Sequence, residues 1–125
     1  SQHLFGIYIA QMGGFDAWGG TYDLDSSSAV GEIAYSYDGM ITDQYGTYNA
    51  YAHFDAPVIN VATSKSGYSD CFSYKVNSFT IDKAALYKKM VESGDTKLEF
   101  TITLKFDPRS SNTAEFTKTV VINLK

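Results

Sequence analysis

A run near the C-terminus alternates strictly between apolar and polar side chains. The apolar positions of this run are Leu98, Phe100, Ile102, Leu104 and Phe106. Side chains two residues apart lie on the same face of a strand, so this period predicts a strand with one face in the core.

A second run repeats the pattern after a segment of turn-forming residues at 107–112. Its apolar positions are Phe116, Val120, Ile122 and Leu124. The two runs predict an antiparallel hairpin. The residues that we expect this hairpin to bury are Phe100, Ile102, Leu104, Val120 and Ile122. Lys118 interrupts the second apolar face, which indicates an exposed edge or a β-bulge at that point.

The segment before this hairpin predicts a short helix at about 82–93. Asp82 can cap its N-terminus, and Gly94 follows its last turn, where glycine commonly ends a helix. Leu86 and Met90 are four residues apart, so they can pack together on the core side of the helix.

Upstream of the helix, short runs with strand character recur along the chain. They lie at 5–9, 33–37, 48–54, 58–61 and 72–76. Phe79 and Ile81 continue the last run after a one-residue shift, which is the pattern of a β-bulge. We therefore predict a mainly β fold. It is a single antiparallel β-sandwich or barrel-like domain over residues 1–125, with one short helix before the C-terminal hairpin.

Charge is divided unevenly along the sequence. Residues 1–64 contain seven acids and no lysine or arginine, and residues 65–125 carry a net charge of +3. The first part also contains seven of the ten tyrosines. We expect an acidic surface region built mainly from residues 1–64, offering rings, hydroxyls and carboxylates. Such a surface suits a sugar, a divalent cation or a basic partner, and it does not suit a phosphate.

Composition excludes several other functions. The sequence pI is about 4.9, so we expect no binding to nucleic acid, and Lys83, Lys88 and Lys89 on the predicted helix are interpreted as a solvated face. No apolar stretch is long enough to span a membrane. Cys71 is the one cysteine, which excludes an internal disulfide and a zinc site made of cysteines. Its strand-like context predicts a small core residue.

The segment Gly13–Tyr22 is the first candidate for a binding site. It has paired glycines on both sides of Trp18, which is typical of a turned loop. A ring displayed on such a loop can stack on a sugar while nearby carboxylates bind the hydroxyls. The candidate ligand-binding residues are Trp18, Tyr22, Tyr37, Tyr45, Asp16 and Asp43. We expect Trp18 to be partly exposed and close to one of these tyrosines. The alternative is that Trp18 covers the core and the glycines serve only the turns.

The segment Asp23–Ser28 is a candidate metal site. It begins like a calcium-binding loop, but Ser28 replaces the glycine at the sixth position and Ala34 replaces the glutamate at the twelfth. An EF-hand is therefore excluded. A looser calcium site that uses Asp23, Asp25 and Asp43 stays open, and no other cofactor is expected.

Catalytic motifs are weak in this sequence. The two histidines are His3 and His53, and neither accompanies a Gly-x-Ser-x-Gly motif. We predict a non-catalytic binding domain at the cell surface or outside the cell, with a carbohydrate as the favoured ligand. The alternative is a structural or adhesive domain of a cell-surface assembly that binds protein, and a small hydrolase comes third. The sequence does not indicate an oligomeric state.

Overall fold

The structure is a computed structural model of the 125-residue chain. It describes residues 9–12, 15–37, 40–43, 46–49, 58–75, 77–106 and 114–125. The predicted loop at 107–112 and most of the predicted runs at 5–9 and 48–54 lie outside these residues. The described strands are β1 (Ile9–Met12), β2 (Gly20–Leu24), β3 (Glu32–Ser36), β4 (Met40–Asp43), β5 (Gly46–Asn49), β6 (Val58–Thr63), β7 (Phe72–Lys75), β8 (Ser78–Asp82), β9 (Lys97–Phe106) and β10 (Ala114–Leu124).

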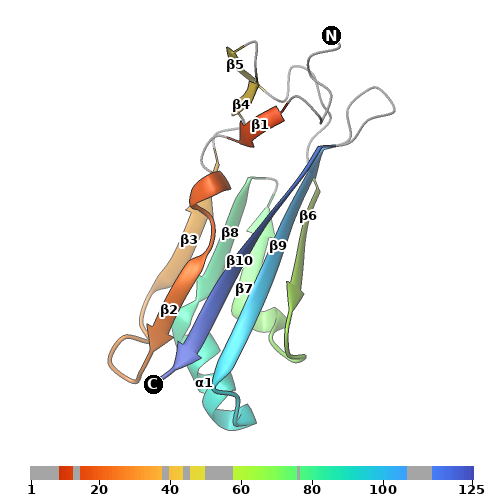
Figure 1. Cartoon of the computed structure of the whole chain (residues 1–125). Helices are drawn as coiled ribbons and strands as arrows, with labels where there is room; N and C mark the ends of the chain where they lie inside the picture. Colours follow the sequence, from red (N-terminus) through yellow and green to blue (C-terminus); the bar gives the residue numbers. More distant parts are fainter. Residues whose placement is uncertain are drawn as a thin grey trace.

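Two of the sheets form the body of the domain (Figure 1). The larger sheet has the strand order β2-β10-β9-β6, and the smaller has the order β3-β8-β7. In the larger sheet β2 runs parallel to β10, and the other neighbours are antiparallel. A third small sheet, with the order β1-β4-β5, lies at the end of the domain opposite the helix (Figure 1).

The predicted C-terminal hairpin is confirmed. β9 and β10 pair without a break from Ala114↔Phe106 to Asn123↔Lys97. All five side chains that the alternation places in the core are fully buried. The bulge predicted at Lys118 is wrong, because the register with β9 is continuous there. β2 pairs with β10 only from Val120 onward, so at Lys118 no described strand pairs with the other edge of β10, which agrees with the predicted edge. Lys118 shares the inward face with the buried residues but is only partly covered, as its long side chain allows.

The predicted bulge after Tyr74 is also wrong. β7 and β8 form a hairpin in which Phe72 pairs with Ile81 and Tyr74 pairs with Phe79. The one-residue shift in the sequence pattern therefore marks a reversal of the chain between Lys75 and Ser78.

Ring contacts join the two sheets. Phe100 of β9 lies 6.0 Å from Phe79 of β8 and 5.3 Å from Phe72 of β7, measured between ring centroids. Residues from both sheets belong to one buried apolar cluster. The mainly β, sandwich-like fold predicted from the sequence is thus confirmed.

The predicted helix is confirmed as α1 (Lys83–Ser93). The Asp82 carboxylate accepts a hydrogen bond of 3.1 Å from the Ala85 backbone N–H, which satisfies one of the free donors of the first turn. Gly94 ends the helix with φ 73°, a conformation that favours glycine. Leu86 and Met90 are fully buried, so they anchor the helix on the core.

A close backbone contact explains one of the paired glycines before β2. Gly19 has φ 121°, and a Cβ there would lie 2.9 Å from the carbonyl oxygen of Thr119 in β10. Glycine therefore lets the chain enter β2 alongside β10. Residues 20–22 were expected in a loop and instead belong to this strand, so the loop prediction is wrong for them.

The inward face of the hairpin generates a stability prediction. Ile102→Ala should lower the free energy of unfolding by about 2–5 kcal/mol, because it leaves a cavity between the sheets. Thr119→Ala, on the exposed face of β10, should lower it by less than about 1 kcal/mol. Urea denaturation of both variants measures the difference. Equal losses would show that the register is assigned wrongly.

Candidate functional site

Trp18 lies inside the domain. Its exposed fraction is 2%, so the prediction of a partly exposed ring is wrong. The ring centroid lies 4.9 Å from Phe15, 5.8 Å from Tyr35 and 6.5 Å from Phe79. The indole N–H donates a hydrogen bond of 3.1 Å to the carbonyl oxygen of Ser36 in β3. This partner lets the ring be buried without leaving its polar group unsatisfied.

The sequence predicted that at least one of Tyr22, Tyr37 and Tyr45 lies near Trp18. Tyr37 is buried and lies 6.1 Å from Trp18, so the expected proximity is confirmed. The hydroxyls of Tyr22 and Tyr35 are hydrogen-bonded to each other. The Tyr35 hydroxyl also donates a hydrogen bond of 2.9 Å to the Gly19 carbonyl oxygen. Burial, followed by the bond to Tyr22, raises the pKa of Tyr35 far above its usual value. These hydroxyls link β2 to β3 along one side of the sandwich.

The structure does not describe the side chains of the three remaining candidate residues. Tyr45 lies outside the described residues, as do the side chains of Asp16 and Asp43. The residues that the structure does bring together with Trp18 are packed in the core.

The carboxylates of the predicted metal segment have partners within the protein. Asp25 accepts hydrogen bonds from the backbone N–H of Ser27, from the Ser27 hydroxyl and from the backbone N–H of Ser28, at 2.9, 2.6 and 2.9 Å. Asp23 lies 3.3 Å from the Asn123 amide and 3.5 Å from the Lys125 ammonium. Among the described residues, no group of three or more His, Cys, Asp or Glu side chains is placed to hold a metal ion.

Cys71 is buried, as predicted from the sequence, with an exposed fraction of 4%. It ends a short 3-10 helix (Ser69–Cys71) just before β7 and so lies outside the strand in which it was expected. Burial raises the pKa of its thiol, and the carboxylates of Asp70 and Asp82 raise it further. The thiol is therefore a poor nucleophile at neutral pH.

Tyr74 is the most exposed aromatic residue among those whose burial the structure describes. It belongs to β7, which ends the smaller sheet, and its exposed fraction is 47%. The ring stacks on Phe72 with a centroid distance of 6.4 Å and an interplanar angle of 18°. Phe72 in turn contacts Phe100 in the core. The sequence pattern placed Tyr74 on the same face as Phe72, but no local signal identified β7 as an edge strand.

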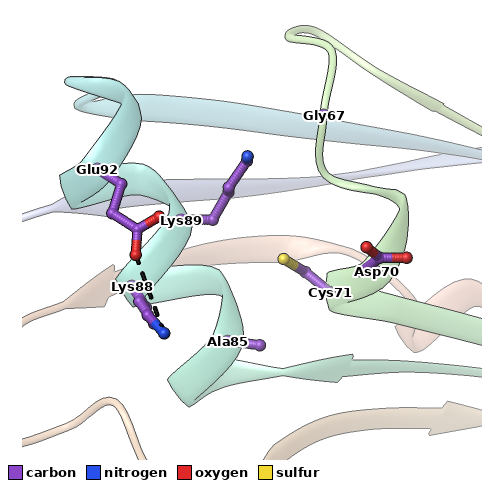
Figure 2. A pocket seen from close by; sticks show the side chains of 7 residues that line it. All are labelled: Gly67, Asp70, Cys71, Ala85, Lys88, Lys89 and Glu92. Carbon is purple, nitrogen blue, oxygen red and sulfur yellow. Dashed lines mark ion pairs between the residues drawn. The ribbon is translucent and has the colours of Figure 1, made fainter.

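A groove of about 240 Å³ lies between α1 and the segment before β7 (Figure 2). Its lining residues are Gly67, Asp70, Cys71, Ala85, Lys88, Lys89 and Glu92. The four helix residues follow one stripe of α1, because they are spaced by three or four positions. Tyr68 fixes the opposite wall of the groove. Its side chain is buried, and its hydroxyl donates a hydrogen bond of 2.7 Å to the carboxylate of Asp95, just after the helix. Lys88 and Lys89, which the sequence pattern indicated as a solvated face, thus line a groove that no local sequence signal identifies.

No family model, curated protein or solved structure matched this chain. Among the described residues, none of the helices has the length and apolar character that a membrane crossing needs.

The burial of Trp18 generates a second prediction. Trp18→Ala should lower the free energy of unfolding by about 3–5 kcal/mol, because it removes a buried ring and its hydrogen bond. Tyr74→Ala is the matched control and should cost less than about 1.5 kcal/mol, since its ring is half-exposed. Thermal unfolding followed by circular dichroism compares the two variants. A Trp18→Ala protein as stable as the wild type would contradict the core assignment.

The turn after β2 generates a third prediction. Hydrogen bonds from Ser27 and Ser28 lower the pKa of Asp25 from 3.8 to about 2. Ionised Asp25 therefore stabilises the fold above its unfolded-state pKa, and this contribution is lost as the pH falls through about 2. An NMR titration of the carboxyl should show that Ser27→Ala raises this pKa, whereas Ser26→Ala leaves it unchanged. An unchanged pKa in the Ser27 variant would contradict this cause.

Proposed function

We propose that this chain is a non-catalytic recognition domain that binds an extended segment of a partner protein along β7, as a structural or adhesive part of a cell-surface assembly. The observation that carries this proposal is the edge of β7 that pairs with no described strand, with the half-exposed Tyr74 upon it.

The backbone of β7 supports a strand-shaped partner. One edge of β7 pairs with β8, and no described strand pairs with the other edge. Ser73, Tyr74 and Lys75 are all exposed. An edge strand presents a row of N–H and C=O groups that an added strand can bind in place of water.

The side chains of β7 supply an anchor and a charge. Tyrosine is favoured at the centre of protein interfaces because one ring provides a large apolar area and a hydroxyl. Stacking on Phe72 limits the movement of the Tyr74 ring before binding, which lowers the entropy lost on association. Lys75 favours a carboxylate on the opposing strand. The partner segment should therefore combine apolar residues, at alternate positions, with an acidic residue.

A carbohydrate ligand is the second candidate. The burial of Trp18 removes the ring on which the sequence-based hypothesis depended. Tyr74 offers an exposed ring for stacking on a sugar, so the same residue can be used to test both functions.

The experiment that tests the proposal selects binders from a displayed library of random linear peptides. The selected peptides should alternate apolar and polar residues and carry an acidic residue. Their binding should shift the backbone amide NMR signals of β7. Tyr74→Ser should weaken their binding at least about tenfold, the effect expected for an interface anchor.

Val91→Ser is the matched control, because Val91 is also half-exposed but lies on α1. It should leave peptide binding unchanged. Peptides that map elsewhere on the domain, or no selected peptides at all, would overturn the proposal. A glycan array that detects binding sensitive to Tyr74→Ser, with no peptide mapped to β7, would replace it with the carbohydrate function.

A further inference from the structure

The groove beside α1 contains charged groups that the fold does not use. Lys88 is 4.0 Å from Glu92, so these two side chains form a weak exposed pair on the helix. The side chains of Lys89 and Asp70 have no hydrogen bond or ion pair with any of the described residues. The Lys89 ammonium on the helix and the Asp70 carboxylate on the opposite wall, both unpaired within the described part of the chain, therefore line the same groove (Figure 2).

The Lys89 side chain is held at the groove. It is only partly exposed, and a Cβ at Gly67 would lie 3.4 Å from its Cε atom. Its aliphatic part thus lies against the Gly67 backbone, while its ammonium is left for another partner. The wall that carries Gly67 and Asp70 is fixed by the bond between Tyr68 and Asp95. Burial, followed by this bond, raises the pKa of Tyr68 to about 12, so the hydroxyl stays protonated and keeps donating at neutral pH.

We propose that this groove binds a small ligand group that carries a carboxylate and a neighbouring N–H donor, such as the end of a peptide or an acylated amino acid. Lys89 binds the carboxylate through a charge-assisted hydrogen bond. Asp70 accepts the hydrogen bond from the N–H group. Lys88 adds positive charge near the carboxylate, although its pair with Glu92 reduces this effect.

The size and lining of the groove limit the ligand to a few heavy atoms. Its volume of about 240 Å³ is below that of the pockets that hold drug-sized molecules. Ala85 and Cys71 supply apolar contacts between the charged groups. A doubly charged anion is disfavoured, because Asp70 and Glu92 balance the two lysines. This inference does not depend on the proposed function of β7.

The test uses N-acetylglycine, which has both groups, as the probe. Its titration into the labelled full chain should give saturable NMR shifts at the amides of Gly67, Cys71 and Lys89. N-acetylglycinamide lacks the carboxylate and should give no saturable shift there. Lys89→Gln should raise the dissociation constant at least about tenfold, as expected for the loss of a charge-assisted bond.

Two further variants separate the groove from general charge effects. Lys97→Gln removes an exposed lysine that is paired with Glu99 at 3.6 Å, and it should leave the dissociation constant within about twofold, since exposed pairs contribute little. Ala85→Leu should abolish binding by filling the groove while the fold is kept, as checked by the melting temperature. No saturable shift with N-acetylglycine, or equal binding by wild type and Lys89→Gln, would overturn the proposal. An equal response to the amide probe would overturn it as well.

Discussion

The aromatic layer between the two sheets is the interaction on which the rest of the structure depends. Trp18 enters it from the segment before β2, Phe79 from β8 and Phe100 from β9. Burying one such ring is typically worth several kcal/mol, which is a large share of the stability of a small domain. The layer fixes the spacing of the sheets and therefore the position of the exposed elements. β7 is tied to it through the contact of Phe72 with Phe100, so the ring of Tyr74 is presented on a rigid base.

The fold was predictable where its signals are local. The period of two in the last two strands identifies their buried face without knowledge of any partner. Asp82 and Gly94 mark the ends of α1, because capping depends on a few consecutive residues. The β7–β8 hairpin was misread for a physical reason. A tight turn and a bulge both shift the apolar period by one residue, and the two residues between Lys75 and Ser78, Val76 and Asn77, include no glycine to indicate a reversal.

The candidate site was less predictable because exposure is decided by tertiary neighbours. A ring beside flexible glycines can turn outward or inward. Trp18 turns inward because the Ser36 carbonyl satisfies its N–H and because Tyr35 and Phe79 contact its ring. Tyr74 is instead half-exposed, because β7 is the last strand of its sheet. Strand order is not encoded in the four residues of β7, so their sequence does not distinguish an edge strand from a central one.

The uneven charge of the sequence is partly evened out by the topology. The parallel pairing of β2 with β10 brings Asp23, from the acidic part of the chain, to Lys125 at the C-terminal end. Lys88 and Lys97 have acidic neighbours of their own. Among the described residues, five other lysines have no ion-pair partner: Lys65, Lys75, Lys83, Lys89 and Lys105. Lys75 is the last residue of β7, and Lys89 lines the groove. A carboxylate that approaches β7 or the groove therefore meets a lysine whose charge is not reduced by an ion pair with a described acid.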